Sequence, residues 1–173
     1  MVLRDQMAKI TNNPKITNEE VVNVNRSAIE HRVTWMGLIY MEAKKAGADA
    51  EKITRAAVAQ TGRQHGAGFR AGMKTPGKID EFAGVFLGPL GMKTFEMDVK
   101  TRSPDALEIQ FHYCPLVAGW LKAGIPKEEI PTLCDIAMDG DRNIAKTVGA
   151  EFKLGKTIAA GDAVCEVNFY KKK

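Results

Sequence analysis

The apolar residues of the chain recur with two different periods, and the change of period divides the sequence. Up to about residue 90 the spacing is three or four residues, as in helices, and after residue 91 short runs alternate between apolar and polar residues, as in strands. The first helix is predicted to begin at the capping-box sequence TNEE, Thr17–Glu20, and to end near Ala46, before Gly47. One side of it carries an apolar series: Val21, Val24, Ala28, Trp35, Leu38 and Ile39.

A second helix is predicted from Ala50 to about Thr61, capped by Asp49, and the short link to the first helix predicts an antiparallel pair. The next stretch, TGRQHGAGFRAG, holds four glycines, each of which costs a helix about 1 kcal/mol relative to alanine. We therefore expect the helix to become irregular or to break there. In such a setting Arg63, His65 and Arg70 could stand beside backbone N–H groups open to an anion. A short helix over 79–86 and a turn at GPLG complete the helical half.

Two alternating runs, TFEMDVKT and ALEIQFHY, flank the turn sequence RSPD and predict an antiparallel hairpin with one buried face. Two helices are expected next, one from Pro115 to just before Gly124 and one from Pro126 to near Gly140. The runs AEFKLGKTI and AVCEVNFY, joined by AAGD, predict a second hairpin. One face of its last strand carries Cys165, Val167 and Phe169.

These elements predict an α+β fold, in which an N-terminal helical pair or bundle packs on a four-stranded antiparallel sheet with inserted helices. We expect a single domain over residues 1–173. It would consist of a loose arm (1–16), a mainly helical part (17–90) and a hairpin-helix-helix-hairpin part (91–173).

The composition is ordinary for a globular protein, with 45% hydrophobic and 27% charged residues. No run is long and apolar enough to span a bilayer, and the N-terminus lacks the apolar core of a signal peptide. The net charge of +4 is not arranged as a basic face with interleaved aromatics. We therefore expect a cytoplasmic protein with a small-molecule substrate and neither a nucleic-acid nor a membrane partner. The long first helix, with Trp35 and Met36, also allows a homo-oligomer.

Three cysteines, an odd number, argue against a disulfide framework and are expected to be reduced. Cys114 precedes Pro115, so it is predicted at the start of a helix, where the dipole and the free N–H groups favour a thiolate. His112 stands two residues earlier and would share a strand face with Cys114 if the strand lasts that far. An imidazole there could act as a general base.

Acidic residues follow in LCDIAMDGDRNIA, where Asp135 lies on a predicted helix and Asp139, Asp141 and Arg142 cluster at its expected end. Acids at a helix C-terminus oppose the dipole, and a broken local rule can mark a functional site. A simple capping turn is the alternative interpretation. Asp162, three residues before Cys165, places another carboxylate near a thiol.

The segments FHYCPL, LCDIAMDGD and LGKTIAAGDAVCEVNF resemble the L-2-amino-thiazoline-4-carboxylic acid hydrolase family. Members of that family carry a Cys-Pro after a strand, a Cys-Asp in the next helix and a terminal Gly-Asp…Cys strand. The N-terminal helices and GRQHG are similar too, so the resemblance covers nearly the whole chain. The ending also resembles 4-vinyl reductase small-molecule-binding domains, although Val167 stands where those domains commonly carry an aromatic residue.

The resemblance implies hydrolysis of a cyclic C=N bond, by which a 2-aminothiazoline carboxylate gives S-carbamoyl-cysteine. Cys114 would attack as a thiolate, and His112 or Asp135 would move protons. The predicted substrate-binding residues are candidate cations for the carboxylate and two nearby acids: Arg63, Arg142, Lys156, Asp139 and Asp141.

Other interpretations of the same residues stay open. No cofactor is expected, but Cys114, Cys134 and Cys165, with His112 as a fourth ligand, match the donor types of a zinc site, although no C-x-x-C spacing is present. The chain could instead be a non-catalytic small-molecule-binding or sensor domain. The three cysteines could also be inert core residues.

Overall fold

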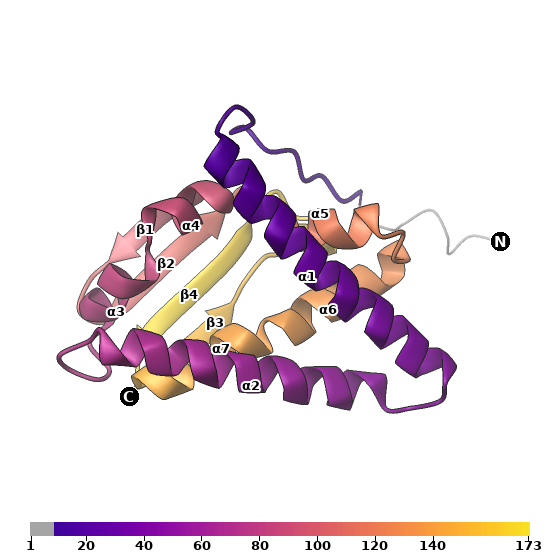
Figure 1. Ribbon diagram of the computed structural model, residues 1–173. Helices are drawn as coiled ribbons and strands as arrows, with labels where there is room; N and C mark the ends of the chain where they lie inside the picture. Colours follow the sequence, from indigo (N-terminus) through magenta and orange to yellow (C-terminus); the bar gives the residue numbers. More distant parts are fainter. Residues whose placement is uncertain (1–8) are drawn as a thin grey trace.

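Helices cover one face of a four-stranded antiparallel sheet in the computed structural model, which describes residues 9–173 (Figure 1). The expected α+β class is confirmed. In chain order the elements are α1 (Glu20–Lys45), α2 (Ala50–Ala71), α3 (Ile79–Phe86), α4 (Pro89–Thr94), β1 (Met97–Arg102), β2 (Ala106–Phe111), α5 (Pro115–Lys122), the 3₁₀ turn η1 (Lys127–Glu129), α6 (Ile130–Ala137), α7 (Asp139–Val148), β3 (Ala150–Leu154), the 3₁₀ turn η2 (Ile158–Ala160) and β4 (Cys165–Lys171).

The strand order is β1-β2-β4-β3, so both predicted hairpins form and the strands β2 and β4 lie side by side at the centre. The register aligns Ile109 with Val167 and Phe111 with Cys165. Cys165 therefore lies beside the end of β2, where the chain leaves the sheet toward Cys114. The apolar face predicted for these strands is buried: Leu107, Ile109, Cys165, Val167 and Phe169.

Aromatic contacts attach the helices to this face. The ring of Phe169 lies 4.9 Å from that of Phe82, 5.2 Å from Phe86 and 5.3 Å from Phe152, measured between centroids. Phe69 of α2 adds edge-to-face contacts with both rings of α3. Such pairs add roughly 0.5–1.5 kcal/mol each beyond the burial of their area. An aromatic cluster around Phe169 thus joins the sheet to α2 and α3.

The glycine-rich stretch belongs to the continuous helix α2, which runs to Ala71, so the predicted irregularity or break after Thr61 is wrong. A Cβ added at Gly62 would lie 2.8 Å from the Cα of Gly140, and one at Gly66 would lie 2.7 Å from the Cβ of Thr147. These glycines let the backbone of α2 approach α7 closely, and that packing offsets their low helix propensity. Because the N–H groups there bond within the helix, they do not form the open anion site that the sequence suggested.

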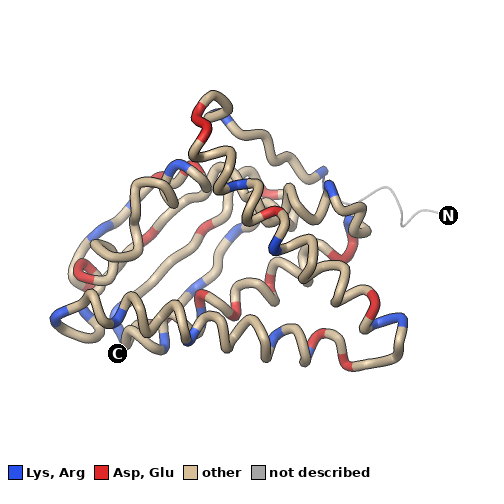
Figure 2. Tube along the Cα trace, in the orientation of Figure 1, with Lys and Arg blue, Asp and Glu red and all other residues tan. Residues whose placement is uncertain are grey.

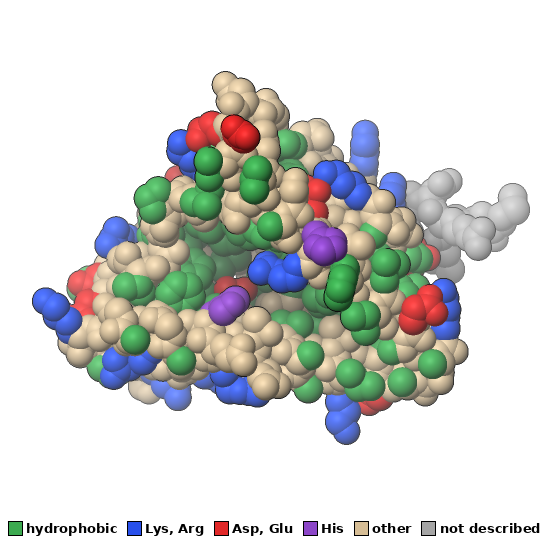
Figure 3. Space-filling view, in the orientation of Figure 1, with side chains coloured by type: hydrophobic (Ala, Val, Ile, Leu, Met, Phe, Trp, Pro, Cys, Tyr) green, Lys and Arg blue, Asp and Glu red, His purple; other side chains and the backbone are tan. Residues whose placement is uncertain are grey.

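The helices α1 and α2 are not the antiparallel pair that the short link predicted. They diverge from their connection (Figure 1): α1 packs across α5, where Gly119 meets Val33, and α2 packs along α7. A hollow opens between α1 and α2 in the space-filling view, with many hydrophobic side chains on its wall (Figure 3).

Three other local predictions are corrected by the structure. The helix α1 begins at Glu20 without a side-chain cap, and the carbonyl of Thr17 accepts a hydrogen bond from the Asn23 side chain instead of the predicted capping box forming. GPLG opens α4 through Pro89 rather than forming only a turn. The helix expected to run to Gly140 ends at Ala137, and α7 begins at Asp139. Asp139 and Asp141 therefore lie in a first turn, where the dipole favours acids.

The segment just before α1 is fixed at its end, although a loose arm was predicted over 1–16. One carboxylate oxygen of Glu96 accepts hydrogen bonds from the backbone N–H groups of Lys15 (2.7 Å) and Ile16 (2.8 Å). The same oxygen pairs with the guanidinium of Arg26 at 3.0 Å, and both side chains are buried. Glu96 adopts a φ of 50°, a left-handed conformation that is uncommon outside glycine. Residues 1–8 of the predicted arm lie outside the described residues.

Charges of both signs are interspersed along the described elements, as the Cα trace shows (Figure 2). Within residues 9–173 no helix combines the length and the apolar character needed to cross a membrane.

Candidate active site

Cys114 occupies the N-cap position of α5, as predicted, with an extended backbone (φ −127°, ψ 104°). Its side chain makes no capping hydrogen bond, which leaves the sulfur free for other partners. Asn12 holds the backbone instead: the Cys114 N–H donates to Asn12 Oδ1 at 2.9 Å, and Asn12 Nδ2 donates to the Cys114 carbonyl at 2.8 Å. The position of the sulfur thus depends on the N-terminal segment, which sequence reasoning did not connect with the site.

Cys114 and Cys165 form a thiol pair at the end of the sheet. A hydrogen bond with the Cys114 side chain is the main cause that raises the pKa of Cys165, and burial raises it further. The N–H of Ile158 also donates to the Cys165 sulfur at 3.3 Å. Cys165 is therefore a neutral thiol at physiological pH and lies next to the Cys114 side chain. The two residues are 7% and 5% exposed, so both are buried.

Cys134 of α6 is the third sulfur in this region. Burial raises its pKa to about 12, and the nearby Cys165 contributes to the same shift. Cys134 is therefore a neutral thiol at physiological pH. The three cysteines gather in one region, a convergence that the sequence alone left undecided.

Of the carboxyls whose charges reach these thiols, which also include Asp135 and Asp162, Asp141 comes from α7. It is partly exposed, yet the surrounding protein desolvates the carboxyl and raises its pKa to about 6. Its charge reaches Cys134, whose pKa it helps to raise. A carboxyl with this pKa exchanges protons near neutrality, which is the property that a general acid needs.

The model of the L-2-amino-thiazoline-4-carboxylic acid hydrolase family matches residues 26–169, which include α1, every cysteine and most of β4. The chain belongs to this family. A comparison with curated proteins gives no match.

In this member of the hydrolase family, the predicted partner His112 is not placed beside Cys114. The strand β2 ends at Phe111, and the N–H groups of the consecutive residues His112 and Tyr113 bond to Glu96 and Phe95. A regular strand would direct these two groups to opposite sides, so the alternation on which the prediction relied is lost. The side chain of His112 lines a separate pocket of about 400 Å³. There it lies near Asp98, whose pKa is lowered mainly by Lys100 and also by His112.

Asp135 is engaged in an ion-pair network rather than facing the thiols alone. Its two oxygens meet Arg55 at 2.6 Å and Arg142 at 2.5 Å, and both arginines also reach Asp139, at 3.2 Å and 2.7 Å. Partial burial opposes ionisation of Asp135, but the hydrogen bonds from Arg142 and Arg55 outweigh it, and its pKa is lowered. Asp135 is thus a fixed anion near neutral pH, and Arg142 already has two carboxylate partners. Arg55 was missed because its only local partner, Glu51, gives an ordinary helix-surface signal.

The remaining predicted substrate-binding cations lie at the surface. Arg63, on the exposed side of α2, donates to Asn143 of α7 at 3.4 Å. Lys156 is exposed and lies 3.9 Å from a carboxylate oxygen of Glu166. Asp162 accepts from the N–H of Thr157 at 3.0 Å, and its charge helps to raise the pKa of Cys165, as its sequence position suggested.

Within residues 9–173, no three His, Cys, Asp or Glu side chains are arranged as ligands of a metal ion. His112, the fourth donor in the zinc alternative, lies with Asp98 in the separate pocket.

Proposed function

We propose that the chain is a hydrolase that opens a small cyclic C–N bond in a substrate like 2-aminothiazoline-4-carboxylate, with Cys114 as the nucleophile. The observation that carries this proposal is the Cys114–Cys165 pair, placed at a strand-to-helix junction in a member of a family named for that hydrolysis. Cys165 supplies the S–H donor that stabilises negative charge on its partner. The N-terminus of α5 adds its dipole to the same effect.

The chemistry needs one nucleophile and one proton donor. The Cys114 thiolate adds to the ring carbon between sulfur and nitrogen of a thiazoline that is protonated on its ring nitrogen. That nitrogen therefore already carries one hydrogen when its bond to the carbon breaks. The leaving nitrogen takes a proton from Asp141 and becomes an amine. Water adds to the enzyme-bound carbon, the Cys114 sulfur leaves, and the product is S-carbamoyl-cysteine. Asp141 regains its proton from the attacking water, and the second proton of that water passes to solvent, which balances the proton that the substrate brought.

In this proposal several residues have roles that differ from those that the sequence suggested. Asp141 replaces His112 and Asp135 as the proton-transferring group, because its charge reaches Cys134 and its pKa is about 6, whereas the pKa of Asp135 is lowered. Arg142 keeps a place beside the site, held by Asp135 and Asp139, where its charge attracts the carboxylate of a substrate. Arg63 and Lys156 contribute at most to the approach of an anion, since both lie exposed at the surface.

The test compares Cys114→Ser with the matched control Cys134→Ser, following ring opening of 2-aminothiazoline-4-carboxylate by mass spectrometry. We expect Cys114→Ser to lower kcat/KM by about 10³-fold or more, since the step has no other nucleophile. Cys134→Ser should keep activity within about tenfold. Substantial activity in Cys114→Ser would exclude the nucleophile.

A non-catalytic binding domain is the second candidate, favoured by the low exposure of all three thiols. It predicts that calorimetry detects binding of the thiazoline while no turnover occurs with any variant. The hydrolase proposal predicts turnover by the wild-type chain, so the two candidates give opposite results in the same assay.

A further inference from the structure

The helix α1 has two apolar faces, and the structure covers one of them. Val22, Ile29, Val33 and Tyr40 are buried on the inner face, against α5 and the core. Five of the seven large hydrophobic side chains that stand exposed within residues 9–173 lie on the opposite face of this helix. They are Val21 (65% exposed), Val24 (63%), Trp35 (62%), Leu38 (46%) and Ile39 (61%). A surface of this kind indicates an interaction site.

The spacing of the outer face specifies a helix as the partner. Residues 21, 24, 28, 31, 35 and 38 follow one another at intervals of three and four, the period of a coiled-coil seam. We call this series the outer seam: Val21, Val24, Ala28, His31, Trp35 and Leu38. A seam with this period pairs with another helix by inserting side chains into holes between four residues of the partner.

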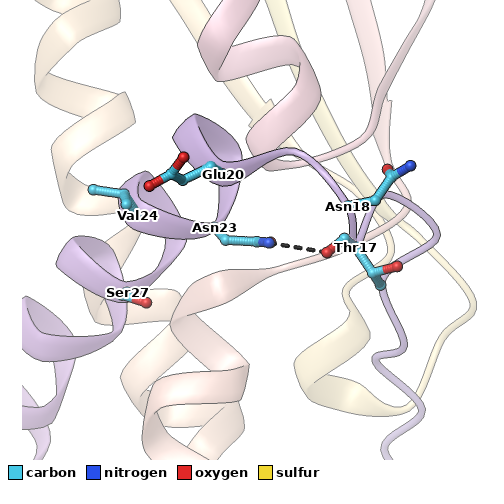
Figure 4. Close-up of a pocket in the computed structure, with 6 residues that line it drawn as sticks. All are labelled: Thr17, Asn18, Glu20, Asn23, Val24 and Ser27. Atoms are coloured by element: carbon cyan, nitrogen blue, oxygen red, sulfur yellow. Dashed lines mark hydrogen bonds between the residues drawn. The ribbon is translucent and has the colours of Figure 1, made fainter.

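The outer seam carries both a knob and a hole. Trp35 projects from it and is held by a hydrogen bond from its indole N–H to His31 Nε2 at 3.0 Å. An open pocket of about 470 Å³ lies along the same helix (Figure 4). Four of its lining residues, Glu20, Asn23, Val24 and Ser27, have the i, i+3, i+4, i+7 spacing that surrounds a hole in coiled-coil packing. Thr17 and Asn18 close its end, and Asn23 bonds to the Thr17 carbonyl at 2.9 Å.

We propose that a second copy of this chain docks on the outer seam, with the two α1 helices antiparallel and each Trp35 inserted into the other copy's pocket at Val24. One register satisfies the whole seam: Val24 faces Trp35, Val21 faces Leu38, and Ala28 faces His31. Because each contact occurs twice, the surface is self-complementary, as a two-fold dimer requires.

Charge favours the antiparallel arrangement over the parallel one. The helix begins with Glu19 and Glu20 and ends with Lys44 and Lys45, so antiparallel pairing directs the acidic start of one copy toward the basic end of the other. Parallel pairing would place the two acidic starts together and the two basic ends together, and such like-charge contacts cost free energy.

The experiment measures the mass of the full chain in solution by sedimentation over a concentration series, for the wild type, Trp35→Ala and Ile53→Glu. We expect a wild-type dimer and a dissociation constant raised about 30-fold or more by Trp35→Ala, as for a buried aromatic anchor. Ile53, 54% exposed but on α2, is the matched control, and Ile53→Glu should dimerise normally. A wild-type monomer at every concentration, or a dimer indifferent to Trp35→Ala, would overturn the proposal.

Cross-linking tests the register. A mixture of Val21→Cys and Leu38→Cys chains should form a disulfide-linked heterodimer, while Val21→Cys alone should not link to itself. Self-linking of Val21→Cys would indicate parallel helices and contradict the proposed contact. Both variants lie at exposed positions, so folding is preserved, and neither readout depends on hydrolase activity.

Discussion

The chemistry of the site depends on how neighbouring groups set the state of single residues. The neighbouring Cys114 thiol and burial raise the pKa of Cys165, so Cys165 remains a neutral thiol near neutral pH. Asp135 and Asp141 share a functional group, yet two arginines lower the pKa of one and burial raises that of the other to about 6. Pairs of like groups with different protonation provide the acid and base forms that catalysis uses.

Replacing Cys165 with alanine should slow the alkylation of Cys114 by about tenfold at neutral pH. In the proposed mechanism the substitution removes the S–H donor to the Cys114 sulfur, and a hydrogen bond to a charged group contributes about 1.5–3 kcal/mol. The measurement is the labelling rate by iodoacetamide, followed on the Cys114 peptide. Cys134→Ala serves as the control and should leave that rate unchanged. A faster reaction of Cys114 in Cys165→Ala would contradict the assigned direction of the hydrogen bond.

Replacing Asp141 with asparagine should stabilise the protein at pH 7–8 by on the order of 1–3 kcal/mol. An aspartate has a pKa of about 3.9 in the unfolded chain, and burial raises that of Asp141 to about 6. Its contribution to stability is therefore fully present below about pH 3.9 and is lost as the pH rises through 6. Urea titrations at a series of pH values should show this loss in the wild type and not in Asp141→Asn. Destabilisation of Asp141→Asn at pH 8 would show that the carboxylate is favourably solvated.

At the scale of elements, the packing of α2 against α7 positions part of the candidate site, because α7 carries Asp141. Local helix propensity led to the expectation of a break at the glycines, since propensity contains no information about a second helix. Glycine is needed at positions 62 and 66 because α7 approaches closely there, at Gly140 and Thr147.

Gly62→Ala should therefore destabilise the fold by about 2–4 kcal/mol, because the added Cβ meets the Gly140 backbone, which cannot move aside without shifting α7. Gly68 lies in the same helix with no atom within 4 Å of an added Cβ. Gly68→Ala should stabilise the protein by about 0.5–1 kcal/mol through helix propensity. Denaturant unfolding of the two variants makes the comparison, and equal effects would contradict the packing explanation.

The strands were the most predictable elements, for a physical reason. Because side chains alternate along a strand and only one face is buried, the apolar residues of β2 and β4 can point only toward the core. The buried residues Leu107, Ile109, Cys165 and Val167 do so. The helix α7 was missed although Ile144 and Val148 have helical spacing, because Gly140 was interpreted as the end of a helix. The site was predictable only in part. Cys114 stands at the junction that Pro115 signals, but its contact with Cys165 depends on strand order, and the role of Asn12 depends on a contact across 102 positions.

At the scale of the whole molecule, Glu96 joins the N-terminal segment, α1 and the start of β1. Its buried pair with Arg26 and its bonds to Lys15 and Ile16 connect segments that are far apart in the sequence. Glu96→Ala should cost about 3–5 kcal/mol, because it leaves the Arg26 charge buried without a partner. Unfolding by guanidinium gives the free energy. The double variant Arg26→Met/Glu96→Ala should recover part of the loss, and no recovery would place the cost elsewhere.

The two hydrogen bonds that Asn12 makes with the backbone of Cys114 have a consequence for the order of folding. The reactive sulfur reaches its final position only after the beginning of the chain, its middle and the strand that carries Cys165 have met. Contacts between such distant positions close slowly, because the intervening chain must first be ordered. During refolding from denaturant, Cys114 should therefore become protected from alkylation later than the helical circular dichroism recovers. The labelling of this one thiol would then report when the whole molecule has finished folding.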